Sequence, residues 1–179
     1  MNIADTTHAP ERAQRAKVHE GSCFCGAVRF TVTSHTPYPF MRCYCSICRK
    51  TAGGGGYAIN IMGDAASLKV TGRQWVSEFR ARIKEKGSSR SKLSPARRNF
   101  CGKCGSALWV WDPRWAENVY PFASAIDTAL PKPPEEVEIM LAYAAPWSEV
   151  PDGPGHTHFR EYPKEGIADW HAKRGLTTD

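Results

Sequence analysis

The sequence predicts a mainly β, single-domain protein, and three observations carry that prediction. The chain has 179 residues, about the length of one domain, with 41% hydrophobic residues, enough for a packed core. Several short segments alternate apolar and polar residues with the period of two that is typical of a half-buried strand. Turn residues separate these segments. The strand segments do not alternate with helical segments, so the sequence does not predict a parallel α/β sheet. We therefore expect short antiparallel strands and a few short helices.

The clearest strand prediction covers residues 27–33, where Val28, Phe30 and Val32 alternate with polar residues. Residues 75–86 alternate in the same way and place basic side chains on one face. Further strands are expected at 57–62, 67–70, 106–111 and 137–143.

Short helices are predicted at residues 46–51, 113–118 and 166–173. The segment 87–98 is rich in Ser and basic residues, and it is predicted as an exposed loop. Residues 1–19 are polar and aperiodic, which predicts an N-terminal tail before a domain at 20–175.

Basic residues are concentrated between Arg73 and Arg98. This segment holds nine Lys or Arg against two Glu, while the whole chain has a formal net charge of +6. Such a surface is typical of a site for an acidic partner, and equally of a solvated strand face beside a polar loop. No helix-turn-helix or RNA-recognition pattern accompanies it. A non-catalytic module that binds an acidic partner or nucleic acid through residues 73–98 is therefore the alternative to the hypothesis developed below.

The longest apolar stretches fall short of the roughly 18 residues of a spanning helix, and the first twenty residues lack the apolar segment of a secretory signal. These features favour a cytoplasmic location without a membrane partner. In a reducing cytosol, cysteines are expected as thiols or metal ligands.

All seven cysteines fall into three clusters with short spacings, which are Cys23 and Cys25, then Cys43, Cys45 and Cys48, then Cys101 and Cys104. Short spacings let several thiolates converge on one ion, and zinc prefers four such ligands in a tetrahedron. Disulfides would leave one cysteine unpaired. A thioredoxin-type pair needs a helix directly after the Cys-x-x-Cys motif, whereas a strand is expected there. Metal binding is thus the favoured prediction.

Seven thiolates cannot complete two tetrahedral sites. If the central trio acts together, the other four cysteines form a closed site of the structural kind, and the trio leaves an open position of the catalytic kind. The spacing also permits Cys48 to join Cys101 and Cys104. His156 and His158 lie in a Gly- and Pro-rich segment and are interpreted as exposed polar residues rather than ligands of a third metal.

Three motifs in this order give the chain a recognisable pattern, namely Gly-Ser-Cys-Phe-Cys-Gly at 21–26, Arg-Cys-Tyr-Cys-Ser-Ile-Cys-Arg-Lys at 42–50 and Phe-Cys-Gly-Lys-Cys-Gly at 100–105. The pattern closely resembles the glutathione-dependent formaldehyde-activating enzyme and centromere protein V family. The resemblance implies a zinc-stapled, mainly β fold with two zinc ions. It implies a structural zinc on the four cysteines Cys23, Cys25, Cys101 and Cys104. It implies a second, open zinc on Cys43, Cys45 and Cys48, which would carry the chemistry.

The family's founding activity joins glutathione to formaldehyde and is of the carbon–sulfur lyase type. The resemblance therefore implies a small thiol such as glutathione and a small aldehyde as partners. Three thiolates make zinc a weak Lewis acid, so we expect this site to hold and activate a thiol. Four cations near the cysteine clusters are candidates to contact the carboxylates of the thiol compound, namely Arg49, Lys50, Arg97 and Arg98.

Overall fold

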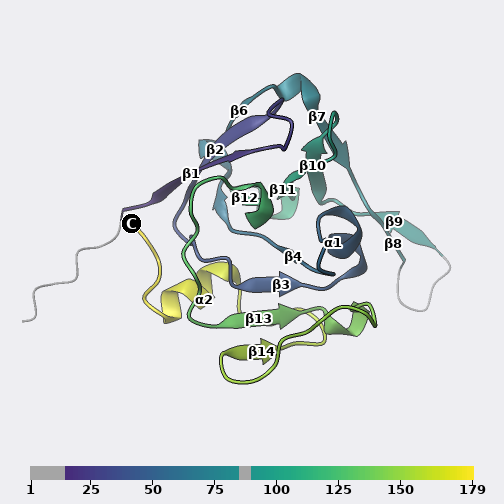
Figure 1. The fold of residues 1–179 in the computed structure, drawn as a ribbon, viewed down its shortest axis with the longest axis vertical. Helices are drawn as coiled ribbons and strands as arrows, with labels where there is room; N and C mark the ends of the chain where they lie inside the picture. Colours follow the sequence, from purple (N-terminus) through teal and green to yellow (C-terminus); the bar gives the residue numbers. More distant parts are fainter. Residues whose placement is uncertain (1–14, 85–89) are drawn as a thin grey trace, which may run out of the picture.

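The computed structural model describes residues 15–84 and 90–179 and confirms a mainly β fold, arranged as several small sheets with two short helices (Figure 1). A three-stranded antiparallel sheet contains β1 (Lys17–Ser22), β2 (Arg29–Ser34) and β6 (Lys69–Thr71). A five-stranded antiparallel sheet contains, in spatial order, β5 (Gly63–Asp64), β12 (Asn118–Pro121), β11 (Ala107–Trp111), β10 (Arg97–Cys101) and β7 (Val76–Phe79).

A four-stranded sheet and a separate hairpin complete the described strands. The sheet contains, in spatial order, β14 (His156–His158), β13 (Glu136–Ile139), β3 (Met41–Cys43) and β4 (Ala58–Ile59). Here β13 pairs in parallel with both β3 and β14, so the expectation of antiparallel strands is wrong for these two pairs, whereas β3 and β4 pair antiparallel as expected. The hairpin consists of β8 (Arg82–Lys84) and β9 (Ser91–Leu93).

The two α-helices are α1 (Ser46–Thr51) and α2 (Ile167–Lys173), both close to their predicted positions. Five single 3-10 turns link the strands, namely η1 (Ala65–Ser67), η2 (Arg73–Trp75), η3 (Pro113–Trp115), η4 (Ala123–Ala125) and η5 (Leu141–Tyr143).

The structure corrects several predicted elements. The predicted loop 87–98 contains β9 and the start of β10, while residues 85–89 lie outside the described residues. The predicted strand 75–86 divides into β7 and β8, because the chain leaves its pairing with β10 and the Ala81 carbonyl accepts from Ser94 N–H in the hairpin. The predicted strand 137–143 ends at Ile139, since Met140 takes a φ of 62° and starts η5.

Two shorter departures occur elsewhere. The predicted helix 113–118 is only the single turn η3, and the predicted strand 57–62 is regular only in β4. At the N-terminus, residues 1–14 of the predicted tail lie outside the described residues, and its last residues from Lys17 onward belong to β1.

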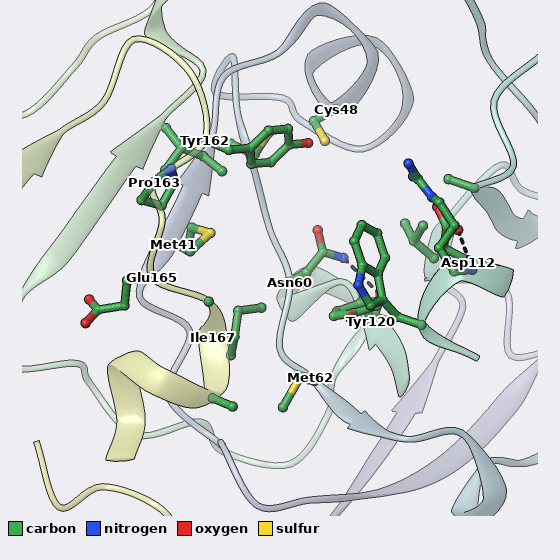
Figure 2. Close-up of a pocket in the computed structure, with 18 of the residues that line it drawn as sticks. Met41, Cys48, Asn60, Met62, Asp112, Tyr120, Tyr162, Pro163, Glu165 and Ile167 are labelled. Atoms are coloured by element: carbon green, nitrogen blue, oxygen red, sulfur yellow. Dashed lines mark hydrogen bonds and ion pairs between the residues drawn. The ribbon is translucent and has the colours of Figure 1, made fainter. Parts of the chain in front are cut away.

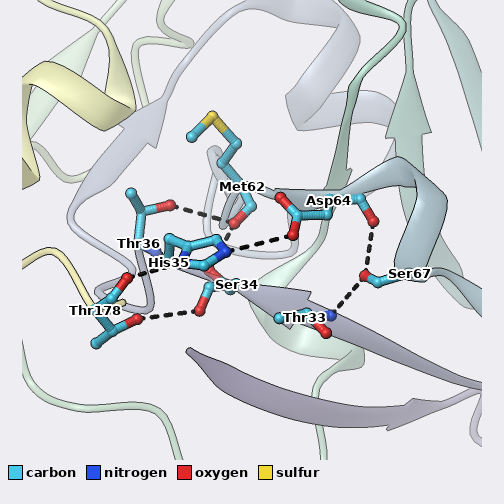
Figure 3. Close-up of polar contacts among 8 residues, drawn as sticks. All are labelled: Thr33, Ser34, His35, Thr36, Met62, Asp64, Ser67 and Thr178. Carbon is cyan, nitrogen blue, oxygen red and sulfur yellow. Dashed lines mark hydrogen bonds and ion pairs between the residues drawn. The ribbon is translucent and has the colours of Figure 1, made fainter. Parts of the chain in front are cut away.

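Several contacts fasten the C-terminal segment to the body of the protein, and two of them bear on the cavity described below. In α2, the ring of Trp170 stacks on Phe40 with 3.8 Å between centroids. Beyond α2, Thr178 N–H donates to the His35 carbonyl at 2.9 Å, and His35 Nδ1 donates to the Thr178 carbonyl at 2.7 Å (Figure 3). Packing therefore extends past residue 175 and fixes the segment before α2, which forms one wall of the cavity described below.

Among the described residues, no helix has the length and apolarity needed to cross a bilayer.

Candidate metal centres and the adjoining cavity

Four cysteines from distant parts of the chain meet at one point. The Sγ atoms of Cys23, Cys25, Cys101 and Cys104 all lie within 4.8 Å of one another. The Cys23–Cys25 and Cys25–Cys101 sulfur distances are 3.5 Å and 3.8 Å. A zinc–sulfur bond of about 2.3 Å gives tetrahedral sulfur–sulfur edges of about 3.8 Å. The donor set and its spacing therefore fit a closed four-thiolate zinc site.

Two tight turns present these sulfurs. Cys23 follows β1, and its carbonyl accepts from Gly26 N–H at 2.9 Å, with Gly26 at a φ of 72°. Cys101 ends β10, and its carbonyl accepts from Gly105 N–H at 2.8 Å, with Gly105 at a φ of 76°. Glycine adopts this left-handed conformation without steric cost, which lets each turn fold back on itself.

Hydrogen bonds to sulfur favour the thiolate form at Cys23 and Cys104 of this cluster. The Val28 N–H donates to Cys23 Sγ at 3.2 Å. The Ser106 hydroxyl lies 3.3 Å from Cys104 Sγ, and this contact lowers the pKa of Cys104 to about 5. A metal ligand must be deprotonated, so these contacts prepare the site for a cation.

The central cysteines form a second cluster of three. The sulfurs of Cys43, Cys45 and Cys48 lie within 4.8 Å of one another, and all three residues are buried. Cys43 ends β3, Cys45 is the N-cap of α1, and Cys48 lies within α1. The spacing alone allowed Cys48 to join Cys101 and Cys104, but the structure keeps it with Cys43 and Cys45.

The local backbone explains why this trio converges. Cys45 caps α1, and its Sγ accepts from Cys48 N–H at 3.3 Å. Contacts with the thiols of Cys43 and then Cys48 lower the pKa of Cys45, which favours its thiolate form. Among the described residues the cluster has three sulfurs and no fourth ligand, which fits an open metal site.

A cavity of about 710 Å³ adjoins the three-cysteine cluster, and both Cys43 and Cys48 line it. The cavity is lined by Met41 and Ile139 on the adjacent strands β3 and β13, and by Val110 and Tyr120 on the adjacent strands β11 and β12. The segment 162–168, just before and within the start of α2, also lines it, and Figure 2 shows Pro163 and Glu165 on the side of Met41, across from Tyr120. In Figure 2 the hydroxyl of Tyr162 points toward Cys48.

Of the four cations proposed from the sequence to contact a thiol's carboxylates, only Arg98 lines the cavity. Its Nη2 donates to Cys48 Sγ at 3.8 Å, which places its charge beside the trio. Arg97 instead lies 3.6 Å from Glu78 and over the ring of Trp111. Arg49 and Lys50, in the last turn of α1, are not among the lining residues.

Sequence reasoning missed the cavity residues that come from the C-terminal segment and from β11. Tyr162, Pro163 and Ile167 follow the cysteine motifs by more than fifty residues, and no spacing rule connects them to the trio. Asp112 and Arg114 also line the cavity, and their separation of two residues at the start of η3 is the one local signal that could have indicated a pair.

A third cluster lies on the four-stranded sheet, away from the cysteine motifs in sequence. Glu136, Glu138 and His156 bring ligand atoms within 4.8 Å, and His156 Nδ1 lies 2.9 Å from Glu138 Oε1. Arg42 forms an ion pair with Glu136. The interpretation of His156 as an exposed residue is wrong, because it is half-buried against a fully buried glutamate. Since Arg42 precedes Cys43 on β3, this network braces the strand that ends at Cys43.

The fold and the two cysteine clusters define a class of protein, namely a mainly β domain with one closed and one open cluster suited to metal ions. The sequence model of the glutathione-dependent formaldehyde-activating enzymes matches residues 18–140, and the chain belongs to this family. The match includes all seven cysteines and ends before the cavity wall at 162–168.

Two further comparisons place the chain among known proteins. It is 57% identical over 157 residues to a Halomonas elongata protein named "Putative glutathione-dependent formaldehyde-activating enzyme", with 88% of this chain and 96% of that protein covered. A crystal structure of a Rhodobacter sphaeroides protein aligns with 63% of this chain and 91% of its own, at 24% identity and a TM-score of 0.47.

Proposed function

We propose that this chain binds a small thiol at an open three-cysteine zinc site and joins it reversibly to formaldehyde or a related small aldehyde, a reaction of the carbon–sulfur lyase type. Glutathione is the first thiol to test, because the family takes its description from it. The observation that carries the proposal is that Cys43, Cys45 and Cys48 form a three-sulfur cluster beside a cavity large enough for both reactants.

In this proposal the four-cysteine cluster has a structural role and the three-cysteine cluster carries the chemistry. Cys23, Cys25, Cys101 and Cys104 would hold a closed zinc that ties β1 to β10. Cys43, Cys45 and Cys48 would hold the open one. Zinc at the open cluster, when bound, supplies a positive centre that lowers the pKa of an incoming thiol below its free value of roughly 8.5.

The chain's own residues provide orientation and charge. Arg98 Nη2 lies 3.8 Å from Cys48 Sγ. Its positive charge offsets part of the negative charge of the cysteine thiolates and thereby favours binding of a further anionic sulfur, that of the thiol compound. Holding both reactants side by side replaces a bimolecular encounter by a positioned one.

The thiol and the aldehyde are the only reactants that the step consumes. The thiol releases its proton to water, its sulfur forms a bond to the aldehyde carbon, the carbonyl π electrons move to oxygen, and that oxygen takes a proton to give the S-hydroxyalkyl adduct. The Tyr162 hydroxyl points toward Cys48 and would donate this proton, regaining one from water (Figure 2). In the lyase direction the same hydroxyl would take the proton back.

The test compares zinc-loaded wild type with Cys48→Ser by NMR, following the rate at which formaldehyde exchanges with its glutathione adduct. The proposal expects accelerated exchange in the wild type and none above the spontaneous rate in the variant. Lys69→Ala, an exposed substitution on β6, serves as the control that retains the acceleration. Equal exchange rates with wild type and Cys48→Ser would refute the proposed role of the trio.

A second candidate function, binding of an acidic partner or nucleic acid, is favoured by one observation. All six residues of the strands β8 and β9 are exposed, and they include Arg82, Lys84 and Lys92. The double variant Arg82→Gln, Lys84→Gln should weaken binding to a DNA duplex at low salt if this surface is the site. No measurable binding by the wild type at low salt would eliminate this candidate.

A further inference from the structure

The cavity beside the three-cysteine cluster is larger than an aldehyde of one carbon needs. Its volume of about 710 Å³ lies in the usual range for sites that enclose a drug-sized molecule. Because the sulfur of a thiol must reach Cys43 and Cys48 at one side, the remaining space is available to the rest of the thiol compound. The side chains of that space therefore decide which thiol fits.

Most of these side chains are apolar. They come from five separate parts of the chain, so the apolar character belongs to the whole cavity, and the main contributors are Met41, Met62, Val110, Trp115, Ile139 and Ile167. Figure 2 shows Met41, Met62 and Ile167 around the same space, on the side away from Asp112. An enclosure of this kind stabilises a hydrocarbon group by removing it from water.

The cations of the cavity offer little to a compound with two carboxylates. Arg114 Nε and Nη2 donate to the two carboxylate oxygens of Asp112 at 2.9 Å and 2.6 Å, and Asp112 is buried. Arg98 Nη2 is directed at Cys48 Sγ, while its buried Nε has no hydrogen-bond partner in the described part of the chain, so Arg98 can meet one carboxylate beside the trio. Lys164, the remaining cation among the described lining residues, is exposed to solvent. Glutathione would therefore leave its second carboxylate without a buried cation in the cavity.

The C-terminal segment of this chain supplies residues 162–168 to the wall of the cavity. Residues 162–168 lie outside the family match at 18–140. They are held in place because Trp170 stacks on Phe40 and Thr178 bonds to His35. The selectivity of the cavity can therefore differ from that of relatives that share only the cysteine motifs.

From these four observations, the geometry points to a thiol compound whose substituent is an uncharged hydrocarbon, aromatic or branched, as the ligand selected by this cavity in preference to glutathione. The inference rests on the proposed function for the position of the sulfur, and it adds the chemical class of the group attached to that sulfur.

The experiment measures the Kd of three thiols for the zinc-loaded, full-length protein by isothermal titration calorimetry. Phenylethanethiol carries the hydrocarbon group, glutathione carries two carboxylates, and mercaptoethanol carries neither. We expect phenylethanethiol to bind at least about tenfold more tightly than glutathione, a difference of about 1.4 kcal/mol. Glutathione binding as tightly as phenylethanethiol, or more tightly, would overturn the inference.

Two variants test the causes separately. Met62→Asp places a charge on the apolar wall and should weaken phenylethanethiol at least about tenfold while changing mercaptoethanol less than about twofold, with Met62→Leu as the conservative control. Asp112→Asn keeps an acceptor for the Arg114 backbone N–H, whose contact to Asp112 Oδ1 is 3.0 Å, but frees the guanidinium charge. It should tighten glutathione by about threefold or more and leave phenylethanethiol unchanged. Unchanged Kd values in both variants would contradict the assignment.

Failure of the proposed function gives a different result. If none of the three thiols binds, or if Cys48→Ser binds them all as the wild type does, the sulfur does not lie at the trio and both proposals are rejected. If all three bind only with Cys48 present and glutathione binds best, the proposed function stands and the apolar selectivity is wrong.

Discussion

Loss of the four-cysteine cluster should destabilise the protein far more than loss of one cysteine from the trio. The perturbation is Cys101→Ser, because Cys101 is fully buried and serine is a poor zinc ligand. A metal that joins Cys25 to Cys101 closes a loop between residues 76 apart. The chain-entropy relation used for crosslinks gives about 4 kcal/mol of stabilisation for a loop of that length.

The matched control is Cys48→Ser, which removes one sulfur from a cluster whose members lie within about five residues of sequence. The same relation gives about 2 kcal/mol for so short a loop, so Cys101→Ser should cost about 2 kcal/mol more. Urea denaturation at saturating zinc, under reducing conditions, measures both free energies of unfolding. Excess chelator should bring the wild type down to the stability of the metal-free variants. Equal losses in the two variants, or no effect of chelator, would refute the assignment of the closed cluster as the structural staple.

Three further predictions concern residues outside the cysteine clusters. His19 is fully buried, and burial first, then the charge of Lys17, lowers its folded pKa to about 4, below the unfolded value of 6.5. Protonation therefore favours the unfolded chain, and the free energy of unfolding should fall as the pH drops below 6.5, by about 1.4 kcal/mol at pH 5.5. Denaturation of His19→Leu over the same pH range should lack this loss. Parallel pH profiles of the wild type and the variant would exclude His19 as its cause. Tyr162→Phe should lower kcat for adduct formation by about a hundredfold with little change in KM, and an unchanged kcat would assign the hydroxyl a packing role only. His156→Ala removes the closer of the two histidines beside the buried Glu138 carboxylate, the other being His158 at 3.7 Å, and should cost about 3 kcal/mol in urea denaturation, whereas a loss below about 1 kcal/mol would mean that the pair contributes little.

The cysteine clusters and the helices were predictable because their signals are local. The short spacings around Cys43, Cys45 and Cys48 reflect how a strand end and one helical turn can present three sulfurs together. Helix α2 was predicted from its flanking Pro163 and Gly175. The grouping of Cys23 and Cys25 with Cys101 and Cys104 is not local, and it came from the family resemblance rather than from spacing.

The rest depends on contacts between distant segments. The parallel pairing of β13 with β3 joins residues almost a hundred positions apart, which no local alternation encodes. Glu138 is buried as a result of that pairing, and β14 brings His156 beside it. No local pattern encodes this contact, so the sequence alone predicted an exposed His156. The cavity wall at 162–168 likewise requires α2 to dock through Trp170 on Phe40.

The central claim is that Cys43, Cys45 and Cys48 hold an open metal site that accepts a thiol. Native mass spectrometry of the zinc-loaded protein, titrated with glutathione and with phenylethanethiol, tests it most directly because each spectrum reports both the zinc count and the bound thiol. We predict two zinc ions per chain and a thiol adduct that disappears in Cys48→Ser. A single zinc ion per chain, or an adduct that persists in Cys48→Ser, would contradict the account.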